Sequence, residues 1–283
     1  MKTPILLLIY NRQEYTQKVF EAIREARPEE LFISADGPKV EIQGNFKLCE
    51  ETRRIVNKIN WPCKVKTLFR DKNLGCKLSI SAGIDWFFEN VSEGIILEDD
   101  CLPNKSFFRY CEMLLEKYRN EEGVMMISGS NPAVSLEISG DYFFSCFYTI
   151  WGWATWKRSW NKFDINMHSW PQFKQEKTIK KVFSGKLKNQ DFTERMFDSV
   201  YNNKKSSVWS LQWVYACIEN ESFVILPKNN LICNIGLIGT HEMNNNQLFL
   251  KTEEIDFDKF SHPPEIKLDP NIEDLLFKKS GLN

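Results

Sequence analysis

The chain has 283 residues, which fits one large domain or two small ones, and 42% of them are hydrophobic, enough to bury a sizeable core. Its 37 Lys and Arg residues balance 38 Asp and Glu residues, so no overall basic field is expected to attract a nucleic acid or an anionic membrane. Eight cysteines form no Cys-x-x-Cys pair, which argues against a zinc site, a redox motif and a disulfide framework.

Short apolar runs alternate with amphipathic stretches in the first half of the chain. The runs are bounded by Gly, Pro, Asn or Asp and predict strands at 4–10, 30–36, 63–69, 94–100 and 123–129. The stretches between them place apolar residues about 3.6 apart and predict helices at 13–26, 46–59, 75–90 and 105–119. This alternation predicts an α/β fold in which helices flank a mostly parallel sheet.

The first apolar run is seven residues long before Asn11 and Arg12 interrupt it. A signal peptide needs a longer run, and a membrane span needs about 20 residues. We therefore expect no transmembrane segment, and a protein of the cytoplasm that works there or beside a membrane.

The second half loses the regular rhythm. We predict a helix with loops in the lysine-rich stretch 176–203, a helix at 209–219, a strand at 223–226 and an extended tail after His241. Trp153, Trp156 and Trp160 have helical spacing and are expected in the core, whereas Trp151 is the better candidate to face a sugar.

The densest acidic group, Glu98, Asp99 and Asp100, ends a predicted buried strand. In open α/β sheets, ligands bind beyond the carboxyl ends of strands. Three adjacent carboxylates repel one another unless a positive charge lies between them, and Mn²⁺ or Mg²⁺, held by one or two carboxylates and phosphate oxygens, would supply it. Such a metal neutralises a leaving diphosphate. An ordinary acidic turn after a strand is the alternative.

Other residues fit the same chemistry without requiring it. His241 could complete a metal site as a neutral imidazole, although a lone histidine is more often structural. Asp36 could bind a base or a ribose, or simply form a turn. Arg12 and Lys77 could contact a diphosphate, although most isolated basic residues are solvated.

The phosphate-binding loops of other nucleotide enzymes are missing from the sequence. It contains neither Gly-x-x-x-x-Gly-Lys-Ser/Thr nor Gly-x-Gly-x-x-Gly, which argues against a P-loop enzyme and a classical dinucleotide fold. No glycine-rich loop follows the first strand, which argues against a sugar nucleotidyltransferase. A metal bridge is then the remaining way to hold a diphosphate.

The segments PILLLIYNR, FISADGP, RDKNLGCKLSISAGIDWFFE, GIILEDDCLP, WGWATWKRSW and NIGLIGTH, in this order, resemble bacterial nucleotide-diphospho-sugar transferases of the GT-A (Rossmann-like) fold. The resemblance covers about residues 1–241. A more distant similarity is to N-acetylglucosaminyltransferase I, whose metal motif is also Glu-Asp-Asp.

The resemblance implies a role for each candidate residue. Arg12 and Asp36 match positions that contact the nucleotide base, and Lys77 is assigned to the donor. Glu98 and Asp99 match residues near the donor sugar and ribose, which makes Glu98 a candidate catalytic residue together with Asp100. Asp100 also matches the direct metal ligand, and His241 a histidine that meets the metal or diphosphate.

Two departures from the family pattern concern the acceptor side. Ser210 stands where the family often has an aspartate, so the carboxylate base that would assist an inverting, in-line attack is not identified. Asp191 and Glu194 are the alternative candidates, unless both are solvated helix charges. The loop before His241 is also shorter than usual.

These features together predict a glycosyltransferase of polysaccharide biosynthesis that uses Mn²⁺ or Mg²⁺. Its donor would be a nucleotide-diphosphate sugar and its acceptor a glycan or another hydroxyl compound, with inversion and without nucleic acid. Residues 1–130 would bind the donor, 131–243 the acceptor, and 244–283 would form an extension. The alternatives are a non-catalytic nucleotide-sugar or glycan-binding protein and a nucleotidyltransferase.

Overall fold

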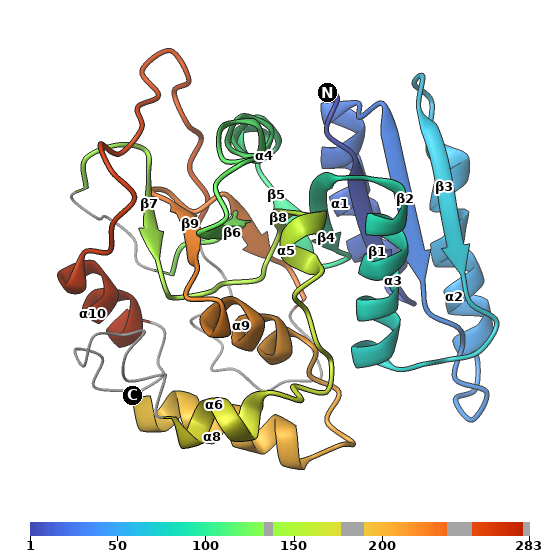
Figure 1. Ribbon diagram of the computed structural model, residues 1–283. Helices are drawn as coiled ribbons and strands as arrows, with labels where there is room; N and C mark the ends of the chain where they lie inside the picture. Colours follow the sequence, from blue (N-terminus) through green and yellow to red (C-terminus); the bar gives the residue numbers. More distant parts are fainter. Residues whose placement is uncertain (133–137, 177–189, 237–250, 280–283) are drawn as a thin grey trace.

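The computed structural model describes residues 1–132, 138–176, 190–236 and 251–279. Within them, an eight-stranded sheet with the order β3-β2-β1-β4-β8-β6-β9-β7 carries helices on both faces (Figure 1). Its strands are β1 (Ile5–Ile9), β2 (Glu30–Ala35), β3 (Lys64–Phe69), β4 (Glu93–Glu98), β6 (Val124–Ser128), β7 (Tyr142–Ser145), β8 (Trp153–Trp156) and β9 (Phe223–Pro227). Four neighbouring pairs are parallel and three antiparallel, which confirms the α/β fold with a mostly parallel sheet.

The helices of the first half confirm the predicted ranges to within a few residues. The helices described are α1 (Gln13–Ala26), α2 (Asn45–Arg53), α3 (Cys76–Asn90), α4 (Lys105–Lys117), α5 (Lys157–Trp160), α6 (Trp170–Gln175), α8 (Gln190–Asn202), α9 (Ser210–Glu219) and α10 (Pro270–Lys279). The predicted helix 46–59 is divided, because α2 continues as the 3₁₀ helix η1 (Arg54–Lys58).

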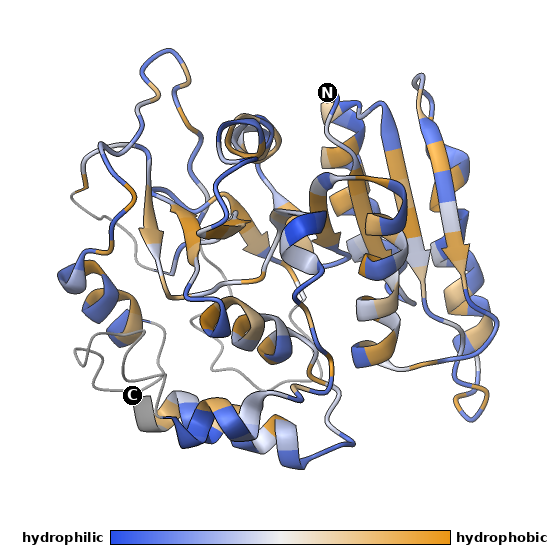
Figure 2. Ribbon diagram, in the orientation of Figure 1, coloured by the Kyte–Doolittle hydropathy of each residue, from blue (hydrophilic) through white to orange (hydrophobic). Residues whose placement is uncertain are grey.

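The core lies on both faces of the sheet because the central strands are apolar on both. On β1, Ile5, Leu7 and Ile9 face the cluster built with α1 and α4, while Leu6 and Leu8 face the cluster built with α3 and α9. Successive side chains on a strand point to opposite faces, so an unbroken apolar run such as this one is typical of a doubly covered strand. Figure 2 shows the hydrophobic strands between helices with one polar side.

The aromatic segment is buried as predicted, but not in the predicted conformation. Trp153, Trp156 and Trp160 are all buried, yet Trp153 and Trp156 lie at the two ends of β8 and point to opposite faces of the sheet. The apparent helical spacing was therefore coincidental. Only Trp160 is in a helix, α5, where its indole NH donates to Asp85 Oδ1 at 2.7 Å.

One continuous sheet passes through both predicted halves of the chain. β6, at the end of the range 1–130, lies between β8 and β9, which belong to the second half. The division into donor and acceptor halves stays a prediction about function. The tail was expected to be extended throughout, but it ends in α10, which begins at Pro270 because proline is well tolerated in the first turn of a helix.

Among the described residues, no helix combines the length and the apolar character needed to cross a membrane.

α10 is held to the sheet by a buried carboxyl group as well as by apolar contacts. Glu273 is 4% exposed, and its Oε2 accepts the Cys146 NH at 3.2 Å, next to β7. Its Oε1 is buried without a hydrogen-bond partner. Burial raises the pKa of Glu273 to about 7, although hydrogen bonds from Ser145 and Cys146 act against the shift.

We predict that Glu273→Gln changes how stability depends on pH. Between about pH 4.5 and pH 7 the folded wild type keeps a proton that the unfolded chain loses, so its free energy of unfolding falls as the pH rises through this window. The neutral amide removes that loss. Urea denaturation should show the variant more stable than the wild type by roughly 3 kcal/mol at about pH 8 and by little at about pH 4.5.

The exposed Glu265, on the same C-terminal segment, provides a matched control as Glu265→Gln. If the stability of the two variants depended on pH in the same way, ionisation of Glu273 would not be the cause of the loss of stability as the pH rises.

Candidate functional site

The first four strands of the chain end at one edge of the sheet. β3, β2, β1 and β4 are adjacent and parallel, so their carboxyl ends lie together, at the lower right of Figure 1. Glu98 is the last residue of β4 and pairs with Leu8 of β1. Asp36 directly follows β2, and Arg12 precedes α1. The strand order therefore brings these predicted residues to the same edge.

Arg12 supplies the positive charge at the acidic end of β4. Its Nη2 forms an ion pair with Asp99 Oδ1 and a second one with Asp100 Oδ2 at 3.0 Å, while its Nε lies 3.4 Å from Asp99 Oδ2. The Asp99 side chain is 5% exposed and that of Asp100 is 16% exposed. The sequence suggested a metal to offset the carboxylates, but a side chain of the protein already does so in part.

The charges of this group shift one another's protonation. Burial lowers the pKa of Arg12, but Asp99 and Asp100 outweigh it and raise that pKa, so the guanidinium stays charged. Burial raises the pKa of Asp99 to about 6 although Arg12 lowers it. Burial, with Asp100 and Asp99, raises the pKa of Glu98 to about 8. At neutral pH Glu98 is therefore a neutral carboxyl group that can donate a hydrogen bond.

The Asp36 carboxylate accepts hydrogen bonds from other groups of the protein. Oδ1 accepts the NH groups of Gly37 at 2.8 Å and Leu74 at 2.9 Å, while Oδ2 accepts the Gly75 NH at 3.0 Å and the Asn73 amide at 2.9 Å. Four donors occupy the roughly four acceptor positions of a carboxylate. The side chain thus fixes the distant turn that leads into α3, which differs from the local turn that the sequence offered as the alternative; a contact with the base stays a prediction.

The turn held by Asp36 places the amino end of α3 beside the acidic residues. Gly75, with φ of +80°, precedes Cys76 and Lys77, the first two helical residues. Cys76 is exposed as a residue, but loss of hydration at its sulfur raises the pKa of the thiol to about 12, and the charges of Glu98, Asp36 and Asp100 add to the shift. Burial and then Lys204 lower the pKa of Lys77. The amino end of a helix favours an anion.

A segment from the second half of the chain covers Asp100. β10 (Ile232–Asn234) pairs with β5 (Cys101–Pro103), and the Ile235 NH donates to the Asp100 carbonyl at 2.8 Å. A Cβ atom on Gly236 would lie 2.6 Å from Asp100 Oδ2. His241, the second predicted metal ligand, follows five residues later and lies outside the described residues.

Asp100 fits a metal only as a single carboxylate ligand. Arg12 holds Oδ2, whereas Oδ1 is near the Cys101 sulfur at 3.6 Å and pairs with no charged group among the described residues. Within the described ranges, no three His, Cys, Asp or Glu side chains are grouped to hold a metal ion. Mg²⁺ is often bound by one or two carboxylates, with substrate phosphates and water completing the shell, so the donor set fits a metal that arrives with a diphosphate.

The predicted acceptor residues lie in the second half of the chain, outside the strands of the sheet. Ser210 is the first residue of α9, and Trp151 is partly buried against the core, next to Gly152 with φ of +59°. Glu194 lies on α8 and is partly buried, while nothing is described for the Asp191 side chain. None of these contacts tests their roles, which stay predictions.

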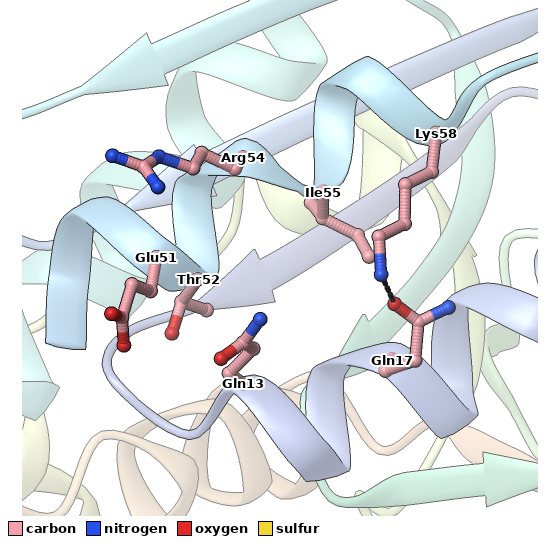
Figure 3. A pocket seen from close by; sticks show the side chains of 7 residues that line it. All are labelled: Gln13, Gln17, Glu51, Thr52, Arg54, Ile55 and Lys58. Atoms are coloured by element: carbon pink, nitrogen blue, oxygen red, sulfur yellow. Dashed lines mark hydrogen bonds between the residues drawn. The ribbon is translucent and has the colours of Figure 1, made fainter.

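A separate polar hollow of about 320 Å³ lies between α1 and the α2–η1 segment (Figure 3). In Figure 3 the Lys58 amine donates to the Gln17 side chain across it. Its lining contains none of the predicted site residues and comprises Gln13, Gln17, Glu51, Thr52, Arg54, Ile55 and Lys58.

Two features of the site could not be predicted from the sequence. Gly236 matters because β10 lies against β5, a pairing between segments about 130 residues apart that no local pattern indicates. Cys76 has no motif of its own, and only the Asp36-bound turn places it near Glu98. The pairing of Arg12 with Asp99 and Asp100 had a weak signal, because all three follow adjacent parallel strands.

No protein-family model and no curated protein sequence matches the chain. Among solved structures, a mannosyltransferase from Pyrobaculum calidifontis in complex with GDP-Man and Mn²⁺ is 10% identical with a TM-score of 0.37, and the match covers 55% of this chain but only 45% of that one. The apo form of UDP-glucose pyrophosphorylase is 11% identical with a TM-score of 0.41, covering 83% and 94% of the two chains.

HddC from Yersinia pseudotuberculosis is 10% identical with a TM-score of 0.34, covering 55% of this chain and 77% of its own. At such identities and TM-scores, these likenesses give no argument for an activity of this chain.

We predict that Gly236→Ala destabilises the site by steric overlap. The added methyl group would meet the Asp100 carboxylate at 2.6 Å and Arg12 Nη1 at 3.2 Å, and overpacking of this kind costs about 1–3 kcal/mol. Gly123→Ala is the control, since its methyl group would meet only Glu121 Oε1, at 3.5 Å. Equal urea midpoints for the two variants would show that the 232–236 segment does not pack firmly on Asp100.

Proposed function

We propose that the chain transfers a sugar from a nucleotide-diphosphate donor to a hydroxyl acceptor. The observation that carries this proposal is the group Arg12, Asp99 and Asp100 at the edge where four parallel strands end. Ligands bind at this edge in open α/β sheets, and the sequence offers no glycine-rich loop as an alternative phosphate site.

The basic groups near the acidic end of β4 suit a diphosphate. In the proposed complex, Lys77 and the amino end of α3 attract the phosphates, which carry negative charge that grows as the sugar leaves. Asp100 would hold Mn²⁺ or Mg²⁺ through the carboxylate oxygen that Arg12 leaves available. When bound, the metal supplies further positive charge to the leaving diphosphate.

Glu98 and Asp99 have different roles in the proposed reaction because their environments differ. Asp99 is held by Arg12 and fixes its guanidinium, so Arg12 presents a rigid, permanently charged group to the donor. Burial favours the protonated form of Glu98, which suits donation of a hydrogen bond to a donor hydroxyl rather than removal of a proton from the acceptor. Inversion and the glycan nature of the acceptor rest on the family resemblance.

We expect Asp100→Asn to abolish metal-dependent transfer or donor hydrolysis without unfolding the protein. The amide keeps the size of the side chain but lacks the charge that a divalent cation needs. Asp71→Asn is the matched control, because Asp71 is an exposed carboxylate just beyond β3 at the same edge. Product release from a panel of nucleotide sugars with Mn²⁺, followed by mass spectrometry, measures the effect.

Three results, the third from a separate assay with nucleoside triphosphates, would count against the proposal. Full activity in the presence of a chelator would contradict the proposed role of the metal. Tight, metal-dependent donor binding with no turnover on any acceptor would favour a binding protein, and release of pyrophosphate from a nucleoside triphosphate and a sugar phosphate would favour a nucleotidyltransferase.

We expect the proton acceptor to be a carboxylate and not Ser210, the first residue of α9. A serine hydroxyl is too weakly basic at neutral pH, so Ser210→Ala should keep most of the transfer rate. Glu194→Gln or Asp191→Asn should lower the rate more. A positioned base contributes roughly 10²–10⁴-fold to the rate, which sets the upper limit of that loss. Initial rates at saturating donor compare the variants. A large loss in Ser210→Ala with normal donor binding would contradict this assignment.

A further inference from the structure

Arg53, the last residue of α2, places a largely buried guanidinium group at the carboxyl edge of the sheet. Its side chain is 12% exposed. Its Nη2 donates to the Asp36 carbonyl at 3.1 Å and to the Arg70 carbonyl at 2.5 Å. Asp36 directly follows β2 and Arg70 directly follows β3, so one guanidinium group joins the ends of two neighbouring strands.

The two carbonyl groups that Arg53 holds lie just beyond the ladder between β2 and β3. The paired residues end at Ala35 and Phe69, after which the backbones separate toward α2 and α3 (Figure 1). Carbonyl groups that leave a ladder need other donors, because a buried carbonyl without a hydrogen bond is unfavourable. Arg53 therefore holds the strand ends together at the point where the ladder no longer does so.

Arg70 ties the same strand ends from the opposite face of the sheet. The Arg53 Cζ atom lies 5.3 Å from the centre of the Phe69 ring, on the face that α1 and α2 cover. Arg70 Nη1 donates to Ser34 Oγ at 3.0 Å. This oxygen is on the face that α3 covers, since a Cβ atom on Gly83 of that helix would lie 2.8 Å from it. The two arginines thus fasten β2 to β3 from both faces.

The residues that Arg53 joins carry the turn at the candidate site. The Asp36 side chain accepts the Gly75 NH at 3.0 Å, and α3 begins at the next residue, with Lys77 in its first turn. The backbone of Asp36 is fixed by Arg53, and so is Arg70, where the segment that leads to α3 starts. Both ends of this segment are therefore tied, directly or through Asp36, to one guanidinium group.

The surroundings of Arg53 suit positioning better than stability. Its Nε atom is buried without a hydrogen-bond partner. Its ion-pair partner Glu50 lies 3.1 Å from Nη1 but is 43% exposed, so water weakens the pair. Replacing a buried ion pair by apolar residues is often neutral or stabilising. An arginine in such a place is better explained by the two carbonyl groups that it holds.

We propose that Arg53 is a positioning residue of the candidate site and acts through Asp36 and the turn before α3. By joining the ends of β2 and β3, it sets where Lys77 and the amino end of α3 lie relative to Arg12. This inference rests on the proposed function, because the ligand that this arrangement receives is the diphosphate of the donor.

Hydrogen–deuterium exchange of the full chain, measured without ligand, tests the positioning. Arg53→Met keeps an apolar stem but has no donors. In this variant the amides of Gly37, Leu74 and Gly75 should exchange about tenfold faster or more, as expected for the loss of a hydrogen bond from a charged group. The factor should be much smaller for amides of β1 and β4. Arg53→Lys should recover part of the protection, because its amine can donate to a carbonyl.

Arg54→Met is the matched control for this experiment. Arg54 is the next residue, is exposed and lines the separate polar hollow (Figure 3). Equal exchange of the turn amides in Arg53→Met and Arg54→Met would overturn the proposal. An equal increase throughout the sheet would overturn it too, since Arg53 would then act on global stability alone.

Donor kinetics test whether the positioned turn serves the proposed reaction. With a nucleotide sugar that the wild type turns over, Arg53→Met should raise the donor KM about tenfold and change kcat much less, because donor binding is weakened. A lowered kcat with an unchanged KM would contradict this role, since loss of folded enzyme has that effect. A wild type that turns over no donor would count against the transferase instead, and the exchange test of Arg53 would remain valid.

Discussion

The ion pairs of Arg12 with Asp99 and Asp100 are the interaction on which the candidate site depends. Asp99 and Asp100 follow a buried strand, and without a counter-charge their carboxylates would repel one another in a region that water reaches only partly. Breaking a buried ion pair by removing one partner is strongly destabilising, because the other charge is left unpaired. One guanidinium group can hold two carboxylates because its NH donors form a rigid fork.

The rest of the edge is built to keep this group in place. β1 and β4 are adjacent, so the residues that follow them are adjacent too. The Asp36 carboxylate accepts hydrogen bonds from the turn before α3, and the β5–β10 pair brings Gly236 against Asp100. The result is an edge where negative carboxylates, a fixed guanidinium and the positive end of a helix lie close together. Such a mixture of charges suits a ligand that is itself charged, and a diphosphate with a divalent cation is one.

The sequence predicted the elements whose pattern is local. Five of the six strands of the first half, all but β5, and its four α-helices were predicted because apolar runs and periods of about 3.6 residues are visible within a single segment. The position of Asp99 and Asp100 at the carboxyl edge of the sheet was predicted because they follow an apolar strand, while their roles stay predictions. Trp153 and Trp156 were assigned to the core correctly but to a helix wrongly, since a spacing of three residues also fits two opposite faces of a strand.

Features that depend on contacts between distant segments could not be predicted. The helix α10 docks through Glu273 on β7, more than 120 residues earlier, and the tail around it is rich in the prolines that suggest extended chain.

The most direct test of the central claim is anomalous scattering from Mn²⁺ in crystals grown with a nucleoside diphosphate. The account predicts a manganese peak within about 2.2 Å of the Asp100 carboxylate, with phosphate oxygens on its other side and Arg12 still paired with Asp99. A diphosphate bound at a different edge of the sheet, or manganese held by residues far from Asp100, would contradict it.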